Sequence, residues 1–183
     1  MKDLGRLILR LTMGGLLAGH GSQKLFDRFG GYGLQGTASF YETLGLKPGK
    51  PWAISAGLSE FGGGTLTALG LLYPLGPMGL MAAMSVAIAK VYLGKPIWAN
   101  EGGAELPLTD LAVALALALE GPGRYSLDHL FGIRLPRALV AAVAIVEAAL
   151  TILAIISRPT PPPPTTGEQA GAELQSGQTA ETR

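Results

Sequence analysis

The first stretch of the chain, residues 4–26, is long enough to cross a bilayer and yet carries several ionisable side chains. About 20 helical residues, at about 1.5 Å each, span the hydrocarbon core of about 30 Å. Spacings of three and four residues place the polar groups on one stripe of such a helix, formed by Arg6, Arg10, His20 and Lys24. Charges at membrane depth are costly unless they face protein or water. The stretch therefore predicts a helix whose ionisable seam faces a bundle supplied by the rest of the chain.

Four further apolar stretches follow the first one, at residues 52–72, 78–93, 106–119 and 138–156. Short loops join neighbouring helices of a bundle in antiparallel fashion. The composition agrees with a membrane protein, because only 15% of the residues are charged, whereas soluble domains carry about a quarter. We therefore predict an all-α fold. It is a polytopic membrane bundle with a four-helix core and a fifth, C-terminal transmembrane helix.

The polar segments between the apolar stretches indicate where the domain boundaries of this chain lie. We expect a membrane domain over residues 1–128, an additional transmembrane helix over 129–157 and a disordered, proline-rich tail over 158–183. The formal net charge of +1 gives no basis for nucleic-acid binding. The absence of cysteine removes disulfides, thiolate metal ligands and a cysteine nucleophile. No zinc motif or phosphate-binding loop is present, so we expect no metal site.

A glycine-rich connection, residues 27–51, follows the first stretch. Gly31, Gly33 and Gly36 stand in the G-x-G-x-x-G spacing of dinucleotide-binding loops. That fingerprint needs a preceding strand inside a βαβ unit, and here an apolar helix precedes it. We therefore interpret these glycines as a turn, followed by a short interfacial helix over residues 37–44.

Ionisable residues from four predicted helices fall in the same half of the membrane. A rise of about 1.5 Å per residue places Glu60, Lys90 and Asp110 within about 12 Å of the face that carries the long loops. His20 and Lys24, in the last turns of the first helix, lie next to the same face. Intramembrane ionisable groups indicate a functional site by default, so we predict a polar pocket here. Their shared depth and opposite signs also predict that Lys24 and Lys90 are electrostatically coupled to Glu60. The alternative to a pocket is that the two lysines and the two carboxylates form ion pairs without any further function.

The residue types in this pocket suit proton transfer or recognition of a carbonyl. His20 has an ordinary pKa near neutrality, so it could relay a proton or hydrogen-bond a quinone carbonyl. We predict that His20, Lys24 and Glu60 are the catalytic group. The substrate-binding candidates are Arg10, Gln23, Lys90, Glu101 and Asp110. A haem would need a second axial ligand beside His20, and His129 is predicted at the other face.

Four short motifs, HGSQKLF, FGGYGLQGT, LSEFGGG and GPGRYSLD, occur in this order along the chain. With them, residues 4–128 resemble the DoxX family of small bacterial membrane proteins. The resemblance implies a four-helix membrane protein. The signature positions that it implies are Arg10, His20, Gln23, Lys24, Glu60, Glu101 and Pro107. The chain departs from the family pattern after Asp128, where it adds a fifth apolar segment and the proline-rich tail.

The resemblance also implies a redox-associated role. Some relatives are linked to quinone-coupled sulfur oxidation, and others to membrane-associated oxidoreductase complexes that handle oxidative stress. Without cysteine, an electron path in this chain would need a bound quinone or the cofactor of a partner protein. We therefore expect a multi-pass protein of the bacterial inner membrane, in contact with lipid and a redox partner, that acts as a quinone-linked subunit or oxidoreductase component. The alternative is a non-catalytic scaffold or small-molecule carrier.

Overall fold

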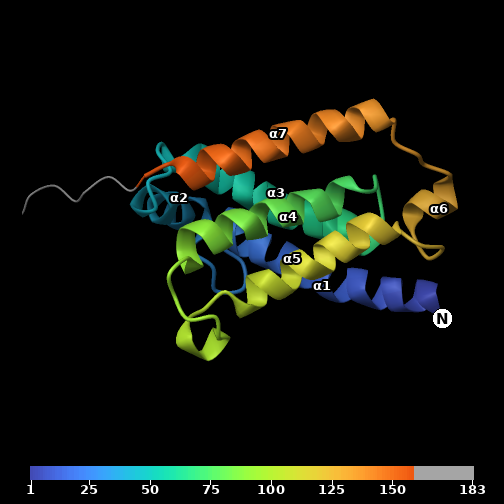
Figure 1. The fold of residues 1–183 in the computed structure, drawn as a ribbon, viewed down its shortest axis with the longest axis horizontal. Coiled ribbons are helices and arrows are strands. Elements are labelled where there is room, and N and C mark those ends of the chain that lie inside the picture. The colour runs from blue at the N-terminus through green and yellow to red at the C-terminus, as the bar shows by residue number, and fades with distance from the viewer. Residues whose placement is uncertain (159–183) are drawn as a thin grey trace, which may run out of the picture.

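The computed structural model describes residues 1–158, and the disorder predicted for the tail lies outside this range (Figure 1). Every regular element within it is helical, which confirms the all-α fold class. In chain order the elements are α1 (Lys2–Phe26), α2 (Gly33–Thr43), α3 (Gly49–Leu69), α4 (Leu75–Ala87), the π-helix η1 (Ile88–Tyr92), the 3₁₀-helix η2 (Ala99–Glu101), α5 (Glu105–Glu120), α6 (Leu127–Phe131) and α7 (Arg137–Ile156).

Five long helical segments correspond to the five apolar stretches of the sequence: α1, α3, α4 with η1, α5 and α7. Two of them, Leu75–Tyr92 and Arg137–Ile156, are long and apolar enough to cross a membrane. The α5 helix has only 16 residues, and α1 and α3 are less apolar. The number of membrane spans therefore stays a prediction.

Glycine residues bring α1 and α3 into close contact. A Cβ atom added to Gly14 would lie 2.6 Å from the carbonyl oxygen of Gly64, and one added to Gly64 would lie 2.5 Å from that of Gly14. Gly21 lies equally close to the backbone of Phe61. Small residues at such positions let two helix backbones approach each other. The last turns of α1 are thereby held beside the middle of α3, where Glu60 lies.

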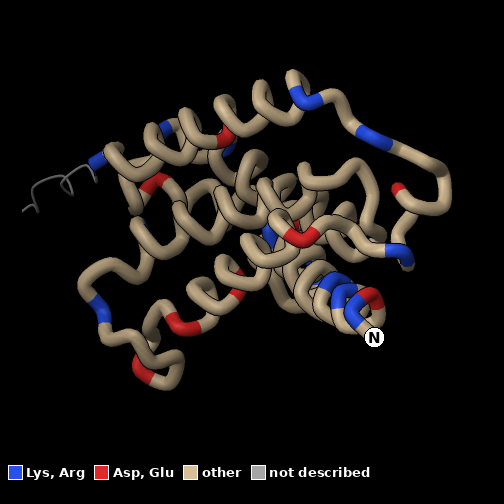
Figure 2. Tube along the Cα trace, turned by 45° about the vertical axis from the view of Figure 1, so that its right-hand side comes forward, with Lys and Arg blue, Asp and Glu red and all other residues tan. Residues whose placement is uncertain are grey.

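An apolar core joins α1 to α4 and α5. Its buried members are Met13, Leu17, Leu80, Met84, Ala114 and Leu117. The α7 helix packs against α4, and Figure 1 shows α3 and α4 between α7 and the α1–α5 pair. Most large apolar side chains of α7 are exposed, among them Ile145 at 70%. Figure 2 shows long uncharged stretches along the helices. Such faces suit contact with lipid.

Two local features differ from the sequence-based expectation. The interfacial helix expected over residues 37–44 is α2, which begins earlier, at Gly33. The polar segment over residues 121–136, which separates the last two apolar stretches, contains a short helix, α6. The side chain of Ser126 caps α6 by accepting a hydrogen bond from the backbone N–H of His129. The predicted domain boundary after Asp128 falls inside α6 and remains a prediction.

Candidate functional site

The predicted coupling between Lys24 and Glu60 is confirmed. Nζ of Lys24 donates a hydrogen bond to Oε1 of Glu60 and forms an ion pair with it. Glu60 is only 4% exposed. Its second oxygen, Oε2, is buried and has no hydrogen-bond partner within residues 1–158. Buried polar atoms normally find a partner, so a proton or a water molecule would satisfy this oxygen.

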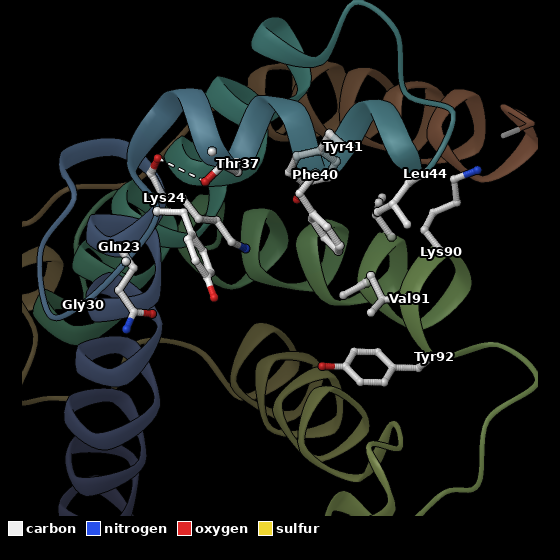
Figure 3. A pocket seen from close by; sticks show the side chains of 15 residues that line it. Gln23, Lys24, Gly30, Thr37, Phe40, Tyr41, Leu44, Lys90, Val91 and Tyr92 are labelled. Atoms are coloured by element: carbon white, nitrogen blue, oxygen red, sulfur yellow. Dashed lines mark hydrogen bonds between the residues drawn. The ribbon is translucent and has the colours of Figure 1, made fainter. Parts of the chain in front are cut away.

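A cavity of about 650 Å³ opens beside Lys24, between the end of α1, α2, and the segment formed by α4 and η1 (Figure 3). Its polar lining comes from Gln23, Lys24, Thr37 and Lys90, and its aromatic lining from Tyr32, Phe40, Tyr41 and Tyr92. In Figure 3, the rings of Phe40 and Tyr92 point into the space between these helices. A mostly apolar cavity with a few convergent polar groups is typical of small-molecule sites.

The wall opposite α1 is made by an irregular helical segment. After Ala87 the α-helix changes into the π-helix η1, which places Lys90, Val91 and Tyr92 on the cavity. Such π-helical turns occur frequently at functional sites. In the sequence, the apolar run of this segment looks like an ordinary continuation of α4, so no signal identified it in advance.

His20 is connected to the cavity through its neighbour. The side chain of His20 is exposed, and its Nδ1 lies 3.0 Å from Oε1 of Gln23. An amide oxygen only accepts, so Nδ1 is the donor in this contact. The amide nitrogen of Gln23 in turn donates to the carbonyl of Phe29 at 3.1 Å. Gln23 lines the cavity and His20 does not. The pair therefore links the cavity wall to the exposed surface of α1.

Asp110 belongs to the same neighbourhood, whereas Glu101 does not line the cavity. Asp110, on α5, is half-buried and lies within electrostatic range of His20 and Glu60. Glu101 is an exposed residue of η2. The structure thus gathers histidine and two carboxylates from α1, α3 and α5.

The predicted coupling of Lys90 to Glu60 is wrong. Nζ of Lys90 donates to the backbone carbonyl of Ser157, at the end of α7. The physical reason is that α7 lies along α4 and brings an unpaired carbonyl of its C-terminus within reach. Lys90 still lines the cavity, so it remains a candidate for contact with a ligand.

Arg10 lies away from the other candidates, about 15 Å along α1 from His20. It is 1% exposed, and its guanidinium donates to the carbonyls of Pro122 and Tyr125. Gly70, which ends α3 with φ 62°, packs directly against it, and a Cβ there would collide with the guanidinium. In this structure Arg10 therefore holds the loop between α5 and α6, at the end of the bundle opposite the cavity.

The same loop is fixed by the buried Asp128. Its carboxylate accepts hydrogen bonds from the backbone N–H groups of Leu72 at 2.9 Å and Tyr73 at 2.7 Å. Its own N–H donates to the carbonyl of Gly70. Burial raises the pKa of Tyr73, in the connection between α3 and α4, to about 12. The GPGRYSLD segment thus ties the α3–α4 connection to α1.

A comparison with protein-family models finds a match to one of them, DoxX, over residues 5–93. Residues 5–93 of the chain therefore form a DoxX-family domain. This domain indicates a membrane-associated protein, and the matched segment runs from α1 to η1, which includes the Lys24–Glu60 pair and every residue that lines the cavity. No curated protein and no solved structure matches the chain. The family resemblance predicted for residues 94–128 lies beyond the matched segment and remains a prediction.

Proposed function

We propose that this protein, with its DoxX-family domain, is a multi-pass protein of the bacterial inner membrane whose cavity beside Lys24 binds a quinone head group. It acts as a redox-associated subunit or oxidoreductase component. The proposal rests on Glu60. Its carboxylate is buried and held by Lys24 of the cavity wall, and one of its oxygens, Oε2, has no hydrogen-bond partner within residues 1–158. A partly buried ionisable pair next to an aromatic cavity is a suitable place for coupled binding and proton transfer.

The cavity suits a quinone in size and chemistry. Its volume of about 650 Å³ lies within the range of about 300–1,000 Å³ found for small-molecule sites. Quinone carbonyls only accept hydrogen bonds, and Lys24 and Gln23 carry donors on one wall. The rings of Phe40 and Tyr92 offer flat apolar surfaces to a planar head group (Figure 3).

The residues around the cavity have different proposed roles in ligand orientation and proton transfer. Lys24 would orient a carbonyl by donating to it, and Glu60 would hold or release a proton at Oε2. His20, which is exposed, would exchange protons with the aqueous side through its contact with Gln23, since histidine is the side chain most suited to proton transfer near neutral pH. Quinone chemistry consumes or yields electrons together with protons, and we propose that a partner protein's cofactor exchanges these electrons.

The second candidate function is a non-catalytic scaffold or small-molecule carrier. It is favoured by the fact that Lys24 and Glu60 neutralise each other, while Arg10 and Asp128 bind backbone groups. Charges arranged in this way stabilise a bundle without any chemistry.

Lipid extraction and mass spectrometry of the gently purified protein test the proposal. We expect quinone in near-stoichiometric amount with the wild type and with Glu101→Gln, whose side chain is exposed and lies off the cavity. Lys24→Met and Glu60→Gln should lose most of it while remaining folded by circular dichroism. Absence of quinone from the wild type, together with full complementation by a variant that lacks both His20 and Glu60, would establish the scaffold instead.

A further inference from the structure

Glu147 is an isolated carboxylate near the middle of α7. Between Arg137 and the end of the helix it is the only charged residue. Within residues 1–158 no ion pair includes it, and no charged group lies within electrostatic range of it. A carboxylate in such apolar surroundings needs a compensating proton, cation or hydrogen-bond donor. The cavity proposed to bind quinone does not use this residue.

Glu147 lines a small cavity of about 60 Å³ between α3, α4 and α7, whose other oxygen-bearing side chains are Tyr41, Ser55, Ser59 and Thr151. Next to this crevice, Gly79 of α4 lines a second cavity, which Ser59 and Glu147 also line. A Cβ added to Gly79 would lie 3.6 Å from Oε1 of Glu147 and 3.6 Å from the backbone carbonyl of Ser59. The carboxylate of α7 and the Ser59 turn of α3 therefore approach the same point.

Three hydroxyl groups, those of Ser55, Ser59 and Thr151, line this crevice and make no hydrogen bond within residues 1–158. Ser55 and Ser59 are four residues apart on α3, as Glu147 and Thr151 are on α7, so each pair shares a helix face. Hydroxyls inside helices often donate to the carbonyl four residues earlier, as Thr65 does to Phe61 at 2.7 Å. Within the part of the chain that the structure describes, no such bond is found for the three hydroxyls of the crevice.

The chemistry of this site selects a small, hard, singly charged cation. All its side-chain donors are oxygen atoms, which suit alkali and alkaline-earth ions rather than softer metals. One carboxylate balances one positive charge, whereas Ca²⁺ sites use six to eight oxygen ligands and usually several carboxylates. The volume of about 60 Å³ has room for one ion and at most a few water molecules.

We propose that Glu147, with the hydroxyls of Ser55, Ser59 and Thr151, forms a binding site for one Na⁺ ion between α3 and α7. A proton on Glu147 competes with the ion, because only the carboxylate form balances its charge. The Tyr41 hydroxyl, from α2, is the one other titratable group of the crevice. The site adjoins the proposed quinone cavity, with which it shares Tyr41 and Val86, and it depends on α7, which lies outside the family match.

Protection from an apolar carbodiimide tests this site in the full-length protein in detergent. The reagent modifies protonated carboxyl groups in apolar surroundings, and peptide mass spectrometry identifies which carboxyl has reacted. At mildly acidic pH we expect Glu147 to react several-fold more slowly in NaCl than in choline chloride of equal ionic strength. Glu60 and Asp110, measured in the same digests, should react equally in both salts.

Variants separate a cation site from a merely protonated carboxyl. Ser59→Ala and Thr151→Val should keep the reaction at Glu147 but lose its protection by Na⁺. Thr65→Val, which removes a hydroxyl of α3 that is bonded to its own helix, should keep that protection. A second measurement is the melting temperature, which Na⁺ should raise in the wild type and not in Glu147→Gln. Equal reaction in both salts, protection that survives in the double variant of Ser59 and Thr151, or a melting temperature indifferent to Na⁺ would each overturn the proposal.

Discussion

Lys24, in the last turn of α1, and Glu60, in the middle of α3, form a partly buried ion pair across 36 residues of sequence. The pair exists because the close glycine contacts between α1 and α3 bring these two turns together. Glu60 is almost fully buried. Each charge compensates the other in surroundings that water reaches poorly, so the removal of either partner leaves an uncompensated charge.

Replacement of Glu60 should therefore destabilise the protein far more than replacement of an exposed carboxylate. We expect Glu60→Gln to lower the free energy of unfolding by about 3–5 kcal/mol, the usual effect of breaking a buried pair. Glu101→Gln is the matched control and should change it very little, since Glu101 is exposed. Thermal unfolding in detergent measures both. Equal and negligible shifts would show that Glu60 is solvated.

The glycine contact that positions this pair can be tested separately. Gly64→Ala would place a methyl group 2.5 Å from the carbonyl oxygen of Gly14, so α1 and α3 must move apart and the melting temperature should fall. Gly62→Ala is the control, because a Cβ there has no atom within 4 Å. Alanine is favoured over glycine inside a helix by about 1 kcal/mol, so this variant should melt at or above the wild-type temperature. Similar losses in both variants would exclude helix separation as the cause.

The sequence predicted this part of the protein because helical spacing carries the information. Residues three or four apart share a face, which identified the polar seam of α1 and its meeting with Glu60. The apolar stretches likewise predicted the five long helical segments, with ends that differ by a few residues. What the spacing could not reveal is the role of single backbone groups. Lys90 donates to the backbone carbonyl of Ser157, 67 residues away. Every residue has such a carbonyl, so the sequence does not indicate which one accepts.

The same limit explains Arg10. Its acceptors are carbonyls in a loop more than 110 residues further on, so from the sequence it appeared only as another member of the polar seam. The sequence predicts GPGRYSLD as part of the family resemblance, but its contacts with Arg10 and the α3–α4 connection required the structure. The π-helix η1 was also missed, since its apolar residues fit an α-helix equally well.

The anchoring role of Arg10 predicts that its loss frees the loop between α5 and α6. Arg10→Gln removes two charge-assisted hydrogen bonds, worth about 1.5–3 kcal/mol each. Trypsin should then cut after the exposed Arg124 much faster than in the wild type. Arg6→Gln breaks the ion pairs with Asp3 and Glu120, whose side chains are partly or largely exposed, so it should raise the cleavage rate far less. Unaltered cleavage in Arg10→Gln would mean that Asp128 alone holds the loop.

Tyr73 predicts a loss of stability at alkaline pH. Its folded-state pKa of about 12 lies above the ordinary value of about 10, so folding favours the neutral phenol. This contribution is fully present below about pH 10 and is lost as the pH rises towards 12. Unfolding measured across this window should show a steeper decline in the wild type than in Tyr73→Phe. Tyr125→Phe, at a 60% exposed position, should behave as the wild type does.

A variant of His20 is the most direct test of the proposed proton transfer. Its side chain is exposed and contacts Gln23 on its own helix, so His20→Gln should leave expression and melting nearly unchanged. A glutamine amide does not titrate near neutral pH, so it cannot relay a proton. We therefore expect this variant to lose the resistance to oxidative challenge that the wild type restores to a deletion strain.

The second histidine provides the matched control for this experiment. His129 lies on α6, at the end of the bundle that holds Arg10, so His129→Gln should complement the deletion fully. Complementation is best compared between about pH 6 and 8, where an imidazole changes its charge. If His20→Gln complements as well as the wild type throughout this range, the proton path through His20 is excluded. The proposed site would then consist of Lys24, Glu60 and the cavity alone, and the scaffold or carrier function would gain support.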